Sequence, residues 1–420
     1  MKWVVKIYSY PKAQTLFLLS TALIPIQLNK YFFTKSSLVL GIPIDYLAIS
    51  IYLFDICALP LFILFFIENK NNLSKFYTRH KTLINILVIF NIYQILSSFS
   101  SSMEFTIPLF FNLKTVEFSL FFIVAVFFLS QKRTFSAFLK IVTVSLSWQS
   151  VLVFFEFFLK RSVGLTFLGE RLFSTTTSQI AHVNIPTGQY LRPYGTFPHP
   201  NVLGAFFIIY LLFLLSRANQ KKIRFQTIKL LAILASSAST VLTFSKTSIF
   251  LLGATIAVNL PKNGKIFLVP AFILMAVMYL IFFSENSINS IAERVTLFEA
   301  SFEVIAQNPM FGVGSNNFIK AMSTQNIMST SLVRLLQPVH NVFLLILAEN
   351  GVIGLLLFLL LLFQVFKFVK TPKTLILFTA LIIYLTVDHF LWTLEQGRLL
   401  FWLSLAFITS SQSRRPSWYI

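Results

Sequence analysis

Uninterrupted apolar runs recur along the whole chain, and they constrain its fold more than any other feature. A helix needs about 17 to 25 apolar residues to span a bilayer, and many of the runs have that length. Hydrophobic residues make up 56% of the sequence and charged residues only 11%. A soluble domain has about 25% charged residues. The runs are continuous and do not alternate, which is against a membrane β-barrel. The sequence therefore predicts an all-α integral membrane protein.

The hydropathy pattern predicts about twelve membrane-spanning helices in a single polytopic domain, residues 1–420. The expected spans lie near residues 14–29, 46–67, 82–98, 115–130, 136–158, 198–216, 226–242, 245–260, 266–284, 339–364, 374–390 and 398–412. The first run follows Lys2, Lys6 and Lys12 and lacks a clear small-residue cleavage site, so it is interpreted as an uncleaved span. Cys57 is the only cysteine, and an internal disulfide is therefore excluded.

Lysine and arginine are concentrated in one set of connections. With the N-terminus in the cytoplasm, most of the 34 basic residues fall in short inner loops, near residues 70–81, 132–140, 217–229, 262–265, 367–373 and 414–415. Basic inner loops are the rule in membrane proteins, so both termini are expected in the cytoplasm. The net charge of +20 is then explained by topology and by attraction to anionic lipids, and we expect no nucleic-acid partner.

The expected outer side holds the longer and more polar connections, near residues 160–197 and 285–338. They contain His182, His199 and His340 or lead directly to them. The working face is therefore expected outside, with residues 285–338 as a large outer loop containing short helices. No internal repeat is evident, which is against an inverted-repeat transporter.

Residues 289–307 are expected to form a polar-faced helix outside the membrane spans. At about 100° per residue, one apolar face collects Ile291, Val295, Phe298, Phe302 and Ile305. Arg294 lies at the edge of that face. One interpretation is an interfacial helix whose arginine reaches toward water. The other is that the planar guanidinium of Arg294 holds an anionic group through two hydrogen bonds.

His340 follows Pro338 at the outer end of a long apolar helix. Imidazole titrates near neutral pH, so His340 is a candidate general base, although a histidine that only caps the helix fits the same pattern. Asn341 comes next to it. Glu349, Asn350 and Gly351 interrupt the apolar run, and such polarity within a span indicates either function or helix packing.

Three further polar stretches lie at the ends of expected spans. Arg192 belongs to a turn rich in proline and glycine, residues 191–201, and faces either water or a ligand. Lys246 lies between two spans on the outer side, against the positive-inside trend, and indicates an anionic partner. The stretch Asp388–Arg398 has charges of both signs, and a structural ion-pair cluster explains it as well as a ligand contact does.

Motifs for cofactors and metals are missing from the sequence. It contains no P-loop, no dinucleotide-binding fingerprint, no CxxC and no HExxH. It also lacks the Asp-x-Asp with which many nucleotide-sugar transferases bind a metal. We therefore expect no cofactor and no metal. In their place, the outer cations would be the groups that neutralise an anionic ligand.

Together these stretches resemble the O-antigen ligase and O-antigen polymerase superfamily of polytopic membrane glycosyltransferases. The residues that carry the resemblance are Arg192-x-x-Gly195-Thr196-Phe197-x-x-Pro200-Asn201, Ser245-Lys246, Arg294, Asn308-Pro309-x-x-Gly312-x-Gly314-x-x-x-Phe318, and Pro338-x-His340-Asn341 followed by Ala348-Glu349-x-Gly351-x-x-Gly354. The motifs cover about residues 190–360, and the topology extends the resemblance to the whole chain. Lys246 departs from the pattern, because the family usually has arginine after this serine.

The resemblance implies a glycosyltransferase in the cytoplasmic (inner) membrane. It would move a glycan from an undecaprenyl-pyrophosphate carrier to an acceptor hydroxyl on the outer face, with inversion and without a metal. A ligase delivers to lipid A–core and a polymerase to another carrier-linked repeat unit, and a third group delivers to protein. The ligase type is the favoured interpretation, with a polymerase or, in a different class, a lipid-linked glycan transporter as alternatives. The expected partners are the donor, a lipid or glycan acceptor, and membrane lipids.

The resemblance also implies roles for individual residues. His340 corresponds to the histidine proposed to activate the acceptor hydroxyl, and Arg294 to an arginine that binds the pyrophosphate. The expected substrate-binding residues are Lys246, Arg192, Asn341 and Glu349.

Overall fold

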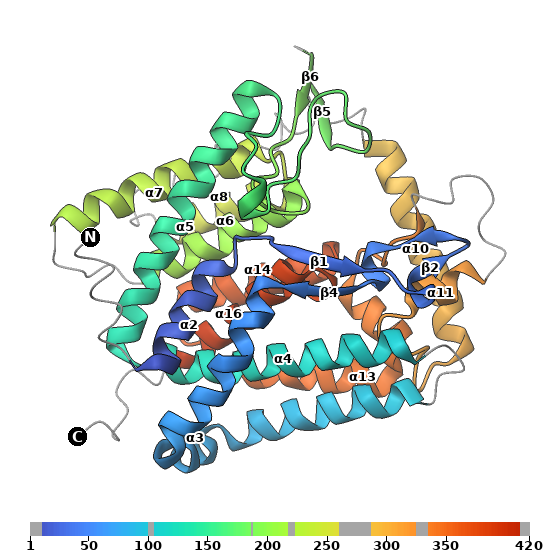
Figure 1. The fold of residues 1–420 in the computed structure, drawn as a ribbon, viewed down its shortest axis with the longest axis horizontal. Helices are drawn as coiled ribbons and strands as arrows, with labels where there is room; N and C mark the ends of the chain where they lie inside the picture. The colour runs from blue at the N-terminus through green and yellow to red at the C-terminus, as the bar shows by residue number, and fades with distance from the viewer. Residues whose placement is uncertain are drawn as a thin grey trace.

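The computed structural model describes residues 11–99, 105–185, 188–216, 223–259, 287–324 and 335–411, and these are mostly helical (Figure 1). The helices are α2 (Lys12–Leu23), α3 (Leu53–Phe99), α4 (Thr106–Leu129), α5 (Lys132–Leu159), α6 (Pro200–Leu215), α7 (Ile223–Leu242), α8 (Lys246–Asn259), α10 (Ser287–Gln307), α11 (Phe318–Ser323), α13 (Val342–Phe366), α14 (Pro372–Val387), α15 (Phe390–Thr393) and α16 (Glu395–Ser410). The predicted helical character is confirmed.

Three small antiparallel hairpins lie in the connections. They pair β1 (Asn29–Phe32) with β4 (Ile49–Tyr52), β2 (Leu38–Val39) with β3 (Ile42–Pro43), and β5 (His182–Ile185) with β6 (Gly188–Leu191). The sequence analysis did not predict them. Their strands are two to four residues long, which is too short for a clear alternating pattern.

Within the described residues, four helices, α3, α4, α5 and α13, are long and apolar enough to cross a membrane. Four shorter apolar stretches, of 10–17 residues, lie within α6, α7, α8 and α14. The structure does not establish the predicted count of about twelve spans. The expected span 266–284 lies outside the described residues. The expected spans 46–67 and 82–98 are joined in α3, which is interrupted only at His80, where the backbone is not helical.

The centre of the bundle is formed by α6 and α16, which are buried along nearly their whole length. Phe213 on α6 stacks on Phe407 on α16 with ring centroids 4.5 Å apart. Both helices are surrounded by other helices, and their sequences therefore lack the polar stripe of an amphipathic helix.

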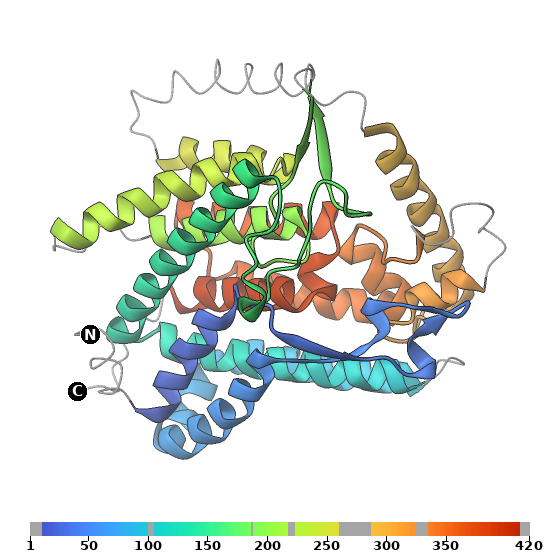
Figure 2. The ribbon, with the colours of Figure 1, turned by 45° about the horizontal axis from the view of Figure 1, so that its top comes forward.

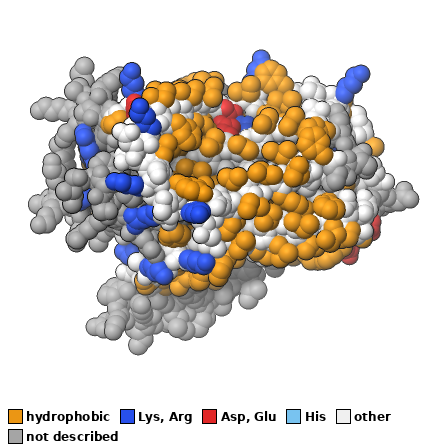
Figure 3. Space-filling view, turned by 90° about the horizontal axis from the view of Figure 1, so that it is seen from below, with side chains coloured by type: hydrophobic (Ala, Val, Ile, Leu, Met, Phe, Trp, Pro, Cys, Tyr) orange, Lys and Arg blue, Asp and Glu red, His pale blue; other side chains and the backbone are white. Residues whose placement is uncertain are grey.

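Connections rich in basic residues meet at one end of the bundle. Phe76, near the kink of α3, contacts Phe127 at the end of α4, and His80 contacts Phe368 in the connection between α13 and α14. Exposed cations flank these contacts: Lys70, Lys75, Arg79, Lys81, Lys132, Arg133, Lys367 and Lys370. Figure 3 shows Lys and Arg gathered toward one side of a face that is otherwise largely hydrophobic. A basic end beside an apolar face is typical of a membrane protein.

The helix predicted at residues 289–307 is confirmed as α10, which lies at one margin of the molecule, while the β5–β6 hairpin projects from another (Figures 1 and 2). Apolar side chains of α10 lie on two sides of the helix. Leu297, Ala300 and Val304 face the protein and are buried. Most of the expected apolar face, including Phe298 and Phe302, is about half exposed. This side is therefore free to contact lipid.

The turn after α10 is locked onto a break in α13. Gly351 has φ 66°, and there the helix is interrupted. A Cβ on Gly351 would lie 2.1 Å from the carbonyl oxygen of Met310, and a Cβ on Gly312 would lie 2.3 Å from the carbonyl carbon of Glu349. Backbone bonds close the contact, from the Val313 N–H to Ala348 and from other N–H groups of the same two segments. Only glycine allows this approach of two backbones.

We predict that Gly312→Ala destabilises the protein more than Gly41→Ala. Both glycines have positive φ, +73° and +79°, so alanine pays a similar conformational penalty of about 1–2 kcal/mol at each. Gly41 has nothing within 4 Å of its added Cβ, whereas Gly312 meets backbone. Thermal unfolding of the two purified variants in detergent measures the difference. Equal shifts of the midpoint would contradict the close approach.

Candidate active site

One large cavity, of about 1210 Å³, collects polar side chains from segments far apart in the sequence. Its walls come from the β1–β4 hairpin, the start of α4, the turns before α6 and α8, the first part of α10, the turn before α13, and the connection from α14 to α16. Of the six predicted site residues, it contains Arg192, Lys246, Arg294 and His340. The sequence analysis had them on four separate segments, and the fold brings them together.

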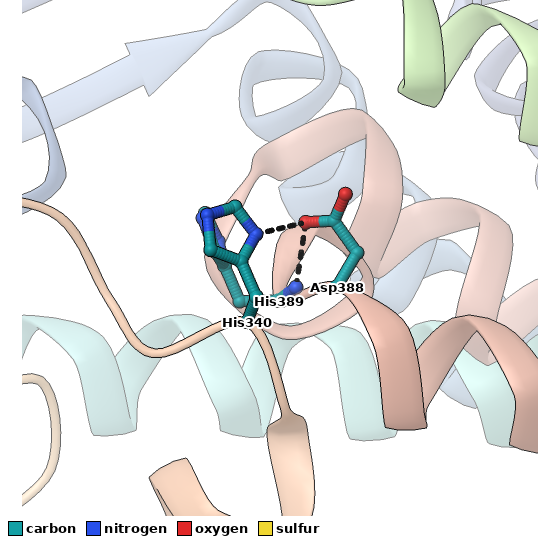
Figure 4. Close-up of side chains that lie close together, drawn as sticks. All are labelled: His340, Asp388 and His389. Atoms are coloured by element: carbon teal, nitrogen blue, oxygen red, sulfur yellow. Dashed lines mark hydrogen bonds and ion pairs between the residues drawn. The ribbon is translucent and has the colours of Figure 1, made fainter. Parts of the chain in front are cut away.

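His340 is paired with Asp388 inside this cavity (Figure 4). The Nδ1 atom of His340 lies 3.3 Å from Oδ1 of Asp388. When Nδ1 carries the proton and donates it to the carboxylate, Nε2 is left as a proton acceptor. The sequence analysis noted Asp388 only as part of a mixed-charge stretch. The histidine and the aspartate are 48 residues apart, and no motif spacing relates them.

Asp388 receives further hydrogen bonds. The N–H of His389 donates to Oδ1 at 2.8 Å, and the side-chain amide of Asn201 donates to Oδ2 at 3.3 Å. Arg192 in turn donates to Oδ1 of Asn201 at 2.8 Å and to the backbone carbonyl of Thr243 at 2.8 Å. A chain of contacts therefore joins the turns before α6 and α8 to the histidine–aspartate pair.

The surroundings shift the pKa values of Asp388 and of the neighbouring His389. Burial would raise the pKa of Asp388, but the hydrogen bond and charge of His340, followed by the charges of His389 and Arg294, hold the pKa well below its usual range. Burial lowers the pKa of His389 to about 3, so this imidazole is neutral near pH 7. Asp388 is thus an anion that can stabilise a protonated His340.

Cationic side chains surround the same cavity. Arg294 donates from Nη1 to the carbonyl of Val387 at 3.0 Å, which holds its guanidinium next to Asp388. Arg192, Lys246 and Arg171 also line the cavity. Burial lowers the pKa of Arg192 to about 10, and it therefore stays charged at neutral pH. The arrangement can bind an anion with several charges.

Local structure explains the position of the Arg192 turn. His199 caps α6, because its Nδ1 accepts the N–H of Asn201 at 3.1 Å. The carboxylate of Glu156, on α5, accepts the N–H groups of Tyr194 and Gly195, both at 2.8 Å. The turn is thus fixed from both sides. The sequence analysis missed Glu156, whose only signal was its charge within an apolar run.

The two remaining predicted residues do not line the cavity. Asn341 caps α13, and its Oδ1 accepts the N–H of Leu344 at 3.0 Å. Glu349 is 2% exposed, and its carboxylate accepts the backbone N–H groups of Asn316 and Phe318. Asn341 thus caps the helix that follows His340, Glu349 holds the loop that leads into α11, and neither side chain lines the cavity.

The same cluster has the composition of a metal site. Ligand atoms of His340, Asp388 and His389 lie within 4.8 Å of one another. A divalent cation would compete with the N–H donors that Asp388 already accepts, and Arg294 beside it would repel the cation. The predicted absence of a metal stays a prediction.

Comparison with known families gives one match. The family model described as O-Antigen ligase matches residues 201–359. The matched stretch contains Asn201, Lys246, Arg294 and His340, and it ends before Asp388. No curated protein matches the chain.

We predict that inorganic pyrophosphate binds in the cavity and that Arg294→Gln weakens its binding about 10-fold to 100-fold, since a hydrogen bond to a charged group contributes about 1.5–3 kcal/mol. Calorimetric titration of the purified protein in detergent measures the affinity. Lys367→Gln is the control, because it removes one positive charge at the exposed basic end. Equal weakening by both variants would show that only net charge matters.

Proposed function

We propose that this chain belongs to the O-antigen ligase and polymerase superfamily, whose family model matches residues 201–359, and that it is a membrane glycosyltransferase of the ligase type. It transfers a glycan from an undecaprenyl-pyrophosphate carrier to an acceptor hydroxyl, with inversion at the anomeric carbon. Donor, acceptor and membrane lipids are its partners. The observation that carries the proposal is the pairing of His340 with Asp388 in a cavity also lined by Arg192, Lys246 and Arg294.

The proposed reaction is one displacement. The acceptor oxygen attacks the anomeric carbon, and its proton passes to Nε2 of His340. The bond from that carbon to the pyrophosphate oxygen breaks, and the pyrophosphate leaves on the lipid carrier. Asp388 keeps Nδ1 protonated and stabilises the imidazolium that forms, while Arg294 and its cationic neighbours stabilise the charge on the leaving group.

The cations remove the need for a metal in this proposal. A pyrophosphate leaving group requires positive charge, and many transferases obtain it from a divalent ion. Arginine supplies a permanent charge and a planar donor pair that match phosphate oxygens. Lys246 supplies a charge without that geometry, so its replacement by arginine is compatible with the role.

We also propose an orientation in the cytoplasmic membrane. The exposed basic residues at the α3 kink and at the α4–α5 and α13–α14 connections would lie in the cytoplasm, with both termini. The cavity would open on the outer face, and residues 285–338 would be a loop of the single polytopic domain. The exposed apolar side of α10 supports this orientation, because it suits contact with lipid near the cavity.

We predict that His340→Ala and Asp388→Asn each lower kcat by about 10² to 10⁴-fold, the usual contribution of a general base. Asparagine would keep the shape of the site but would not hold Nδ1 protonated. Pyrophosphate binding should be largely kept in both variants. The assay is transfer from a carrier-linked glycan by purified protein, in buffer with and without EDTA.

His182→Ala is the matched control, since His182 lines the same cavity but makes no ion pair among the described residues. It should be milder. Near wild-type turnover of His340→Ala would reject the base assignment. Loss of wild-type activity in EDTA, restored by a divalent ion, would instead support a metal held by His340, Asp388 and His389.

Reporter fusions test the orientation. A fusion at Lys370 should report the cytoplasm, because it follows the basic end of α13, and a fusion at Gly188 should report the outside. An outer signal from Lys370 or a cytoplasmic signal from Gly188 would remove the argument for an outer active site.

A further inference from the structure

One face of the β1–β4 hairpin lines the cavity. In its register Asn29 pairs with Tyr52, and Tyr31 pairs with Ser50. Alternate residues of a strand point to the same face, and these four residues all belong to the cavity wall. Ile51, on the other face, is 45% exposed and does not line it. The hairpin therefore presents hydroxyls, an amide and aromatic rings to the cavity.

The hydroxyl groups on this face are organised among themselves. The hydroxyl oxygens of Tyr31 and Tyr52 lie 3.1 Å apart, within hydrogen-bonding distance. The backbone N–H of Tyr52 donates to the carboxylate of Asp55 at 2.9 Å, which fixes the end of the strand at the start of α3. Hydroxyl groups both donate and accept, so a pair of them can bind the hydroxyls of a ligand in either sense.

A carboxylate extends this wall. Lys114 lies with Nζ 5.6 Å from the ring centre of Tyr52 and 3.5 Å from Oε1 of Glu395. Glu395 begins α16 and lines the cavity, as does Gln396 next to it. Lys114 also pairs with Asp55 and Glu117, and these contacts together place the Glu395 side chain beside Tyr52.

The wall connects to the histidine–aspartate pair. Tyr46, between the two strands, packs edge-on against His389 with ring centres 5.5 Å apart, and His389 lies 4.9 Å from His340. On the other side, Asp388 leads through Asn201 to Arg192. The pair therefore lies between a wall rich in tyrosine and a wall rich in cations.

We propose that the tyrosine wall, formed by Asn29, Tyr31, Ser50, Tyr52 and Glu395, is the binding site for the acceptor saccharide. Its neutral hydroxyls, amide and rings suit a polyhydroxylated sugar ring, which has both hydrogen-bonding edges and apolar faces. A pyrophosphate prefers the cationic wall. The inference rests on the proposed function and adds the place from which the attacking hydroxyl reaches His340.

The test is the double variant Tyr31→Phe/Tyr52→Phe. It removes both hydroxyls, so neither is left without its partner, and it keeps both rings. We expect the KM for the acceptor to rise about 10-fold, as the loss of one or two neutral hydrogen bonds predicts. The kcat and the KM for the carrier-linked donor should stay within about twofold. Ile51→Ala, on the opposite face of the same hairpin, should leave all three unchanged.

Two acceptors are used as probes, purified lipid A–core and a carrier-linked repeat unit. If the wild type transfers to either one and only the acceptor KM rises in the double variant, the subsite is supported. An unchanged acceptor KM, or an equal rise in Ile51→Ala, would overturn the subsite and leave the transferase proposal intact. Absence of transfer by the wild type to both acceptors would overturn the transferase proposal, and the subsite with it.

Discussion

The buried carboxylate of Asp388 is the constraint on which the candidate active site depends. It is 8% exposed in a very apolar chain, and an ionised carboxylate at such a position needs hydrogen bonds and opposite charge around it. It obtains them from His340 before α13, from Asn201 at the start of α6 and from the N–H of His389. Arg294 of α10 is held next to it through the carbonyl of Val387. Stabilisation of the Asp388 charge thus requires four distant segments to lie close together. The same arrangement places His340 and Asp388 in the geometry expected of a general base and its partner.

The interlocked turns give this cluster a fixed frame. α10 carries Arg294, and α13 begins just after His340, so the two helices must keep a constant relation for base and cation to serve one substrate. Gly312 and Gly351 allow the backbones of the two segments to touch, and Glu349 accepts N–H groups from the loop that precedes α11. Tyr93 of α3 donates its hydroxyl to the carbonyl of Asn350 at 2.8 Å and joins the frame to another helix. Polarity within α13 therefore serves packing here, which was one of the two interpretations that the sequence allowed.

Sequence reasoning identified those parts of the candidate site that depend on helical periodicity or on short motifs. The period of about 100° per residue predicts α10, and the order of short motifs indicates His340 and Arg294. The pairing of His340 with Asp388 has no such signal, because it depends on how α13 and α14 pack. The β1–β4 hairpin was not predicted for the same reason: β4 lies within an expected span, and the hairpin is defined by the pairing of Asn29–Phe32 with Ile49–Tyr52, which has no local signal. The side of α10 that meets the protein was also not predictable, since lipid and protein both accept an apolar face.

In a displacement at an anomeric carbon, the nucleophile attacks from the side opposite to the leaving group. The reaction is faster when both groups are bound in this arrangement before it begins. A cavity with uniform chemistry would bind pyrophosphate and sugar in competing poses. Here the contacts run from Arg192 through Asn201 and Asp388 to His340, and from His340 through His389 to Tyr46. The base therefore lies where the cationic wall meets the tyrosine wall. In the proposed reaction, each substrate group would bind to the wall whose chemistry it matches, and the reacting hydroxyl would be the one that lies at their junction.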